Sequence, residues 1–332
     1  MTIDLPGGGL TGSAPSAVTF QPRMPGLRYL TEGGTETEIM FRHGHTLRDF
    51  AMFELMDKPA AVADLRGMYR KLLDTIAQHG FGAMLAGFDY RASPDWGAKL
   101  GYSPDGLAEM QHRCIDFLRE VSAPYRDDLP DIAICGCVGP RGDAYAANRE
   151  ITAEAAEDYH SVQLATLREC GVDLVWGATF NNIPEAVGLS HAAARTGLPL
   201  NLHFTLTGAH RLSSGPTLRE AIEQTDAQAG AAKPDSYGLN CSHPVEFEPA
   251  LEPDDWTLRI RAIRPNAAKM EKIALCKLNH IEEGDPEELG RMMGDLARRH
   301  PQIDIFGGCC GTWERHLDAI ARRVKAVRSQ TA

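Results

Sequence analysis

The chain has 332 residues, of which 45 are acidic and 34 are basic, so its formal net charge is −11. Apolar residues make up 43% and charged residues 24% of the sequence, a globular composition that excludes collagen, coiled coil and wholesale disorder. Because the sequence has no Lys/Arg cluster for a basic face and no apolar run approaching 18 residues, it predicts neither a nucleic-acid partner nor a membrane span.

Residues 1–25 have the composition of a flexible tail, with three consecutive glycines and scattered Ser, Thr and Pro. The first 20 residues contain neither the basic segment nor the apolar core of a signal peptide. The eight cysteines are too few for a disulfide scaffold. We therefore expect a protein of the reducing cytoplasm, where grouped cysteines more often bind metal or carry out chemistry than form disulfides.

From residue 26 onward, short apolar runs of strand length alternate with longer segments of helical period. The predicted strands are Leu27–Thr31, Gly82–Phe88, Ile132–Val138, Val172–Ala178, Pro199–Phe204, Ser236–Leu239, Leu258–Ile263 and Ile303–Phe306. The predicted helices are Ala63–His79, Leu107–Val121, Ala153–Cys170, Pro184–Thr196, Leu218–Ala229, Pro244–Leu251, Pro286–Arg299 and Thr312–Arg328. Start signals support several of them, such as the capping-box spacing of Thr217 and Glu220.

Eight β–α units in sequence order predict a closed parallel (β/α)8 barrel, the TIM-barrel fold, rather than an open doubly wound sheet. We expect it to form a single domain over residues 26–332. The first βα connection, residues 32–62, is long and is expected to contain an insertion over the mouth of the barrel. The basic stretch Arg259–Asn279 leaves the position of the seventh strand ambiguous.

Two adjacent cysteines follow the last predicted strand, in the run Gly307-Gly308-Cys309-Cys310-Gly311-Thr312. In a straight strand their sulfurs would point to opposite faces, but the flanking glycines let the backbone bend so that both can face one point. The run is compatible with a vicinal disulfide, which is strained and rare, or with two thiolates on one metal, which we favour.

A third cysteine, Cys241, follows the sixth predicted strand in the same way. Since alternate strands of a barrel supply side chains to the same layers, Cys241, Cys309 and Cys310 are predicted to meet at the carboxyl-terminal mouth. Three thiolates with one open position suit a catalytic Zn²⁺ site, although soft ligands also admit Cu(I) or an iron–sulfur cluster. The alternative without a function is a set of buried free cysteines.

The remaining cysteines and most histidines are interpreted as structural. Core or bystander positions are predicted for Cys114, Cys135, Cys137, Cys170 and Cys276. Solvated helix or loop positions are predicted for His79, His160, His191, His280 and His300. His203 is predicted to be a buried core histidine, and His316 to fix the start of the last helix or the Cys309-Cys310 loop. His243 is the histidine considered as a further metal ligand, because it lies two residues after Cys241.

Three segments together resemble the homocysteine S-methyltransferase family: Glu32-Gly33-Gly34-Thr35-Glu36-Thr37-Glu38, Gly238-Leu239-Asn240-Cys241 and Gly307-Gly308-Cys309-Cys310-Gly311-Thr312. Weaker similarities lie at Asp89–Ser93, Gly139-Pro140 and Arg264-Pro265-Asn266, and the order and spacing match across residues 28–328. The resemblance implies a zinc-bearing barrel that methylates a thiol, with Cys241, Cys309 and Cys310 as the Zn²⁺ ligands.

The resemblance also implies residues that bind the substrate. Gly33 and Gly34 would shape the first loop around the amino-acid end of homocysteine, and Glu32, where the family usually has Asp, would bind the ammonium group. Tyr90, Asn240 and Asn266 complete the set of expected substrate-binding residues.

One departure from the family pattern concerns the same ammonium group. After strand four the family commonly has a Glu that also holds it, and this chain has Ala178 there. Loss of one member of a charge pair costs about 2–5 kcal/mol of binding free energy. Either Glu32 therefore compensates for the missing Glu, or the acceptor is not homocysteine. The second-strand segment Ala86–Asp89 also departs from the usual Thr/Asn-rich run.

The implied partners are a small-molecule thiol acceptor and a methyl donor. A thiolate is the nucleophilic form of a thiol, and coordination to Zn²⁺ removes its proton, so no general base is expected at the methyl-transfer step. An onium donor would suit cation–π contact with aromatic residues near the mouth, for which the candidates are Tyr90, Trp176, Phe180 and Trp313. Since the sequence ends soon after the last predicted helix, we expect neither the long C-terminal extension of betaine-using relatives nor a cobalamin or folate module. S-methylmethionine or S-adenosylmethionine is therefore the expected donor.

Three alternatives remain at this point. One is the same chemistry on a different thiol, another is a betaine or corrinoid-type donor, and the third is a non-catalytic zinc-binding protein.

Overall fold

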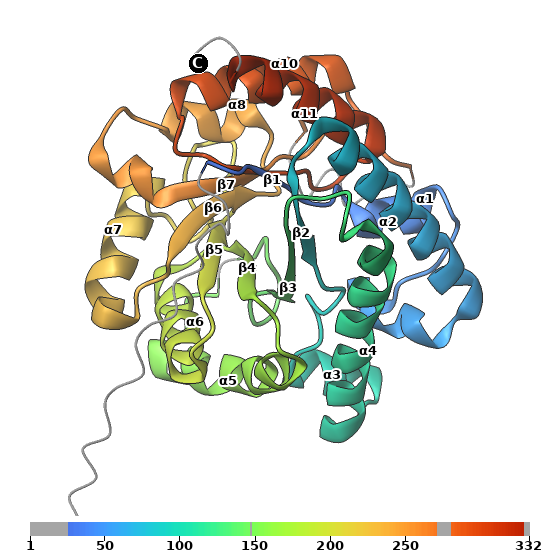
Figure 1. The fold of residues 1–332 in the computed structure, drawn as a ribbon. Coiled ribbons are helices and arrows are strands. Elements are labelled where there is room, and N and C mark those ends of the chain that lie inside the picture. The colour runs from blue at the N-terminus through green and yellow to red at the C-terminus, as the bar shows by residue number, and fades with distance from the viewer. Residues whose placement is uncertain (1–25, 147, 271–279, 329–332) are drawn as a thin grey trace, which may run out of the picture.

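The computed structural model describes residues 26–146, 148–270 and 280–328, so the predicted tail at 1–25 and Cys276 lie outside the described residues. A closed barrel of parallel strands forms the centre of the molecule and helices surround it (Figure 1). The strands, in chain order, are β1 (Tyr29–Leu30), β2 (Gly82–Ala86), β3 (Ile132–Val138), β4 (Leu174–Phe180), β5 (Leu200–Phe204), β6 (Ser236–Asn240), β7 (Ile260–Arg264) and β8 (Ile305–Phe306).

Each strand pairs in parallel with its neighbour in sequence, and β1 closes the barrel on β8 through the register Tyr29↔Ile305. This closure confirms the predicted (β/α)8 barrel. The β4–β5 register shifts between Gly177 and Phe180, where Thr179 adopts a positive φ of 61°. A shift of this kind re-aims the side chains at the end of a strand, and β4 ends at the mouth of the barrel.

Eight of the described helices overlap the predicted segments and differ from them mainly at their ends, whereas the helices Thr35–Phe41 and Pro94–Leu100 were not predicted. The helices are α1 (Thr35–Phe41), α2 (Pro59–His79), α3 (Pro94–Leu100), α4 (Pro104–Ser122), α5 (Ala153–Cys170), α6 (Ile183–Thr196), α7 (Leu218–Ala229), α8 (Pro244–Phe247), α10 (Pro286–Arg299) and α11 (Glu314–Arg328). The predicted capping box of Thr217 and Glu220 is present at the start of α7. Short 3₁₀ segments complete the description, at Arg48–Phe50, Met52–Asp57, Ala123–Tyr125, Gly230–Ala232, Glu248–Ala250 and Asp255–Arg259.

Several predicted boundaries are wrong, and at the following places local backbone signals outweigh hydrophobic periodicity. Helix α2 begins at Pro59, because a proline at the first helical position needs no N–H partner. The helix predicted over Pro244–Leu251 divides into α8 and a 3₁₀ turn. Strand β7 begins at Ile260 because the preceding Asp255–Arg259 forms a 3₁₀ helix that the Asp254 side chain caps.

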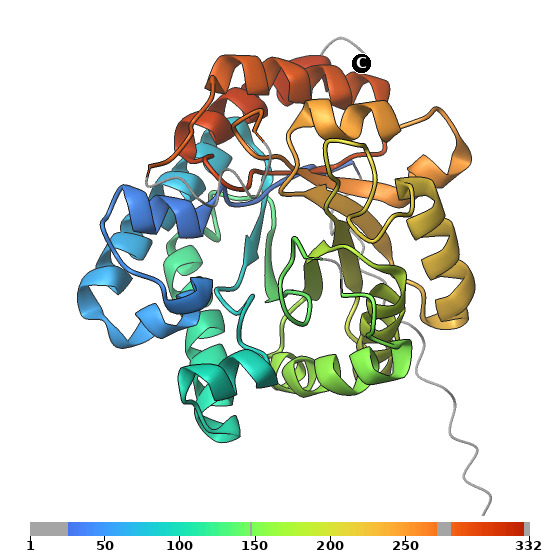
Figure 2. The same cartoon turned by 180° about the vertical axis from the view of Figure 1, so that it is seen from behind.

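The long first connection forms α1 and two 3₁₀ segments, and Figure 2 shows this blue part of the chain at one side of the barrel. Inside the barrel, a lower layer of larger residues includes Tyr29, Met84, Leu174 and Ile305. The upper layer has small residues, Ala86, Cys137 and Ala178. Because side chains normally fill the lumen of such barrels, this small layer leaves room for a cavity at the carboxyl-terminal end. Within the described residues, no helix is long and apolar enough to cross a membrane.

Candidate metal and active site

Three cysteine sulfurs lie together at the carboxyl-terminal mouth of the barrel. Cys241 follows β6, and Cys309 and Cys310 follow β8. The three sulfur atoms are all within 4.8 Å of one another. This geometry agrees with the predicted meeting of the three cysteines, and three soft donors at this spacing fit a thiophilic ion such as Zn²⁺.

Cys241 has a backbone conformation that L-residues seldom adopt, with φ of 53°. A left-handed residue other than glycine costs about 1–2 kcal/mol, so the surroundings must hold it there. The Cys241 N–H donates to the Arg264 carbonyl (3.2 Å), and the Asn266 amide donates to the Cys241 carbonyl (3.2 Å). The backbone after β7 therefore aims Cys241 at the other two sulfurs.

The loop that carries Cys309 and Cys310 packs directly on the first loop of the barrel. Gly34 N–H donates to the Thr312 carbonyl (2.8 Å), and Gly311 N–H donates to the Thr37 hydroxyl (3.1 Å). A Cβ atom on Gly34 would lie 2.5 Å from the Cys309 carbonyl oxygen, closer than real Cβ contacts come. Glycine is therefore required where α1 begins, because the two loops approach through their backbones.

The structure contains a disulfide between Cys241 and Cys309, and Cys310 is not part of this bond. The bond joins cysteines of different strands, so the vicinal pairing considered for Cys309 and Cys310 is not the one observed. Because thiolates are the metal-binding form, the three-sulfur cluster can bind a metal only when this disulfide is reduced.

A cavity of about 510 Å³ opens beside the three cysteines, within the range of small-molecule sites. The upper lumen layer contributes Ala86, Cys137 and Ala178, and the long first connection contributes Thr35, Glu36, Phe50 and Met52. Burial raises the pKa of Cys137 well above its usual value, so this thiol stays neutral and belongs to the wall rather than to the metal cluster.

A buried ion pair forms one wall of the cavity. The Arg264 guanidinium lies 3.4 Å from the Glu32 carboxylate, and both side chains are about 95% buried, at 6% and 5% exposure. Glu32 also accepts a hydrogen bond from the Ala86 N–H (2.5 Å). Burial raises the pKa of Glu32, while the charge of Arg264 opposes this shift. Glu32 thus already has a positive partner within the protein.

Arg264 also joins the loops around the site. Its guanidinium donates to the Gly308 carbonyl (3.2 Å) and to the Glu32 carbonyl (3.2 Å), and it lies 3.6 Å from the centre of the Trp176 ring. Sequence reasoning did not assign this role. The available signal was a charged residue at the carboxyl end of β7, the second arginine of that strand.

The residues predicted to bind substrate fall into two groups. The cavity is lined by Glu32, Gly33, Tyr90 and Asn240, whereas Gly34 and Asn266 do not line it and instead position the cysteine loops. Asn240 accepts from the Thr179 N–H (2.9 Å) through its side-chain oxygen and so stabilises the irregular end of β4.

Two of the four aromatic candidates reach the cavity. Tyr90 and Trp176 line it, while Trp313 lines a smaller cavity between α1, α2 and α11 and Phe180 packs against His160. Trp96, which the sequence analysis did not single out, also lines the main cavity, with the Arg91 guanidinium over its ring at 4.2 Å.

The predictions for His203 and His316 hold, whereas two histidines predicted to be solvated, His160 and His300, are buried. His203 is a buried core residue, and burial lowers its pKa well below the usual value. His316 accepts from the Trp313 N–H (3.3 Å) at the start of α11, as predicted. His160, predicted to be solvated, is fully buried, because it lies on the face of α5 that packs on α6.

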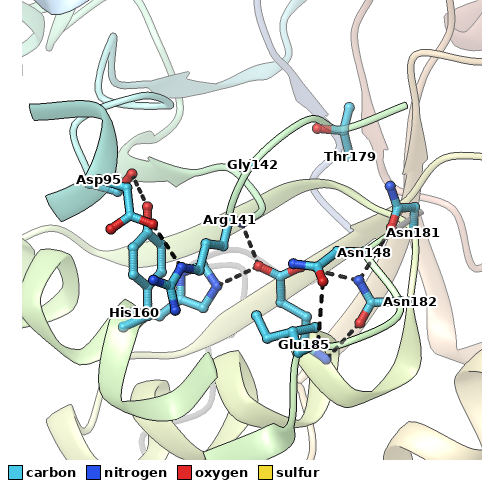
Figure 3. A network of polar contacts seen from close by, with 12 residues as sticks. Asp95, Arg141, Gly142, Asn148, His160, Thr179, Asn181, Asn182 and Glu185 are labelled. Carbon is cyan, nitrogen blue, oxygen red and sulfur yellow. Dashed lines mark hydrogen bonds and ion pairs between the residues drawn. The ribbon is translucent and has the colours of Figure 1, made fainter. Parts of the chain in front are cut away.

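His160 belongs to a polar network that holds the connection after β3 (Figure 3). The buried Glu185 accepts from the Arg141 N–H (2.5 Å) and lies 3.1 Å from His160 Nε2. The Asn181 amide donates to the Ala144 carbonyl (2.6 Å). Because Ala144 lines the cavity, this network fixes one edge of the site.

His243 lies away from the described three-sulfur group. It precedes α8 as its N-cap, and its Nδ1 accepts from the Val245 N–H (3.3 Å). Among the residues that the structure describes, the cluster of possible metal ligands at the mouth consists of the three cysteines. Three cysteine donors are the number of protein ligands that catalytic zinc sites use.

The chain is similar to a known protein family and to curated relatives. The family model described as homocysteine S-methyltransferase matches residues 29–324. A selenocysteine Se-methyltransferase of Brassica oleracea var. italica is 23% identical over 330 residues, covering 90% of each chain. A homocysteine S-methyltransferase of Escherichia coli (strain K12) is 25% identical over 257 residues, which cover 70% of this chain and 77% of that one.

Solved structures share the fold. The homocysteine methyltransferase MmuM of Escherichia coli, in a form described as oxidised, superposes with a TM-score of 0.72 at 20% identity, covering 90% of this chain and 96% of that one. The form described as metallated gives a TM-score of 0.69 with the same identity and coverage.

Proposed function

The chain belongs to the homocysteine S-methyltransferase family and is a methyltransferase, and we propose that it transfers a methyl group from a sulfonium donor to the thiol of homocysteine, giving methionine. The observation that carries the proposal is the group of three cysteine sulfurs within 4.8 Å of one another at the edge of a 510 Å³ cavity. S-methylmethionine or S-adenosylmethionine is the proposed donor.

A Zn²⁺ ion held by Cys241, Cys309 and Cys310 would supply an open Lewis-acidic position at which an acceptor thiol is deprotonated at neutral pH. Cys137 in the cavity wall is kept neutral by burial, which raises its pKa, and His203, whose pKa burial lowers, does not line the cavity. A free thiol has a pKa of about 8.5, so the chemistry needs an activated thiolate.

The protein residues would bind and orient the two substrates for direct displacement. The acceptor sulfur forms a bond to the methyl carbon, the bond from that carbon to the donor sulfur breaks, and its electron pair stays on the donor as a neutral thioether. The apolar walls formed by Phe50, Met52, Phe88 and Trp96 would exclude water from this exchange. Because the site depends on reduced thiols, we place the reaction in the cytoplasm.

Methyl transfer to homocysteine from a panel of donors tests the proposal. The reduced wild type is expected to form methionine with about one Zn²⁺ per chain, and Cys309→Ala is expected to lose both. Cys170→Ser serves as the matched control, because Cys170 lies at the end of α5 outside the cluster. A metal-free wild type that still forms methionine would contradict the proposed site.

A second candidate is the same chemistry on a different thiol, and Ala178 favours it. This residue lines the cavity at the end of β4 and offers no charge to a substrate ammonium. A panel of thiols separates the two candidates: a thiol without an amino group that surpasses homocysteine would select the second.

A further inference from the structure

The acidic groups that line the main cavity differ in how their charge is balanced. Glu32 is paired with the buried Arg264. Asp49 lies 2.7 Å from the Lys99 ammonium, and Asp143 is exposed at the rim and accepts from the Tyr145 N–H. None of these three carboxylates is both inside the cavity and without a partner.

Glu36 is different. Its side chain lines the same cavity, is partly buried and makes no hydrogen bond or ion pair with another of the described residues. Burial raises the pKa of its carboxyl group, while the charges of Arg264 and Arg91 act in the opposite direction. An unpaired carboxylate in a partly desolvated place is costly, and a cationic ligand would relieve that cost.

The position of Glu36 is fixed relative to the cysteines. It lies in the first turn of α1, next to Thr37, whose hydroxyl accepts from Gly311 N–H (3.1 Å) and donates to the Gly34 carbonyl (2.8 Å). The negative charge of Glu36 contributes to the raised pKa values of Tyr90 and Cys137, and both of these residues line the cavity. The carboxylate therefore faces the lumen from a turn that is bonded to the Cys309–Gly311 loop.

We propose that Glu36 binds the α-ammonium group of the thiol acceptor and thereby selects amino-acid thiols over thiols without an amino group. This inference rests on the proposed function, because it places the acceptor sulfur at the cysteines. An ammonium group suits Glu36 because it offers three N–H donors and a full positive charge to one carboxylate. Glu32 is less available for this role, since Arg264 already compensates its charge. The small Ala178 leaves space for the amino-acid end of the ligand.

Calorimetric binding of two ligands to the reduced, zinc-loaded protein tests the assignment. L-Homocysteine carries the ammonium group, and 4-mercaptobutyrate has the same thiol and carboxylate without it. Glu36→Gln is expected to lower the affinity for L-homocysteine at least tenfold and the affinity for 4-mercaptobutyrate less than twofold. Glu38→Gln is the matched control on the same helix, because Glu38 is buried beside a separate small cavity; it should bind both ligands as the wild type does.

Two results would overturn the assignment: unchanged L-homocysteine affinity in Glu36→Gln, or an equal loss for both thiols. A wild type that prefers 4-mercaptobutyrate would overturn it as well. Methyl transfer measured on the same samples separates this inference from the proposed function. Transfer to both thiols without an effect of Glu36 refutes only the Glu36 assignment. Selective binding without transfer from any donor refutes only the proposed reaction.

Discussion

Replacement of Arg264 by Met should destabilise the protein through the buried pair with Glu32. The change keeps much of the side-chain volume and removes the ion pair at 3.4 Å, two hydrogen bonds at 3.2 Å and the charge above Trp176. Removing one partner of a buried pair costs about 3–5 kcal/mol, and the long contacts here place the expected loss near 3 kcal/mol.

The loss should depend on pH because Glu32 is left without its counter-charge. Burial already raises the folded pKa of Glu32 above its unfolded value, and removal of Arg264 raises that pKa further. An acid with a raised folded pKa loses stability as the pH rises above its unfolded pKa, which is about 4.3. Arg264→Met should therefore be closer to the wild type at pH 5 than at pH 8.

Urea denaturation of the reduced protein, followed by circular dichroism, measures both effects. Glu32→Gln combined with Arg264→Met should recover at least about 1 kcal/mol, because the uncompensated charge is gone. Arg261→Met is the matched control on β7: it breaks the more exposed pair with Asp304 and should cost about 1 kcal/mol. Equal losses for the two arginine variants at every pH would refute the reasoning.

Two further substitutions test how the cysteine loops are positioned. Gly34→Ala should lower zinc affinity at least about tenfold, since its Cβ would lie 2.5 Å from the Cys309 carbonyl; a chelator competition measures this, and unchanged affinity would argue against the backbone contact. Asn266→Ala removes the hydrogen bond that holds Cys241 in its left-handed conformation. The zinc affinity should fall about 10–100-fold, because loss of a contact that supports a metal ligand has an effect of this size. Wild-type affinity in Asn266→Ala, measured by the same competition, would show that Asn266 is not needed to hold Cys241.

The barrel was predictable because its signal repeats along the whole chain. Each strand reads as a short apolar run and each long helix has a matching period, so eight units in order point to one closed fold. The ends of elements depend on single residues instead. Pro59 begins α2 earlier than its apolar period does, and the capped 3₁₀ helix before Ile260 delays β7.

The three cysteines were predictable because strand parity carries spatial information. Cysteines follow two even-numbered strands, and the structure brings their sulfur atoms within 4.8 Å of one another. Charge compensation across the lumen was not predictable in this way. The pairing of Glu32 with Arg264 joins residues 232 positions apart, and no local pattern specifies such a contact.

His160 had a local signal that periodicity could have used. It follows the buried Ala156 by four residues and precedes the buried Leu164 by four, so it lies on the buried face of α5. Histidine is often solvated on helices, and that expectation outweighed the spacing. Its contact with Glu185 depends on α6, which periodicity within α5 does not reveal.

The central claim is that three cysteine thiolates leave one ligand position open for the acceptor. Zinc-edge X-ray absorption of the reduced protein, recorded with and without homocysteine, tests it most directly. We predict three sulfur ligands and one lighter ligand per Zn²⁺ in the free protein, changing to four sulfur ligands when homocysteine binds. A zinc shell that already contains four protein ligands, or one that homocysteine leaves unchanged, would contradict the account.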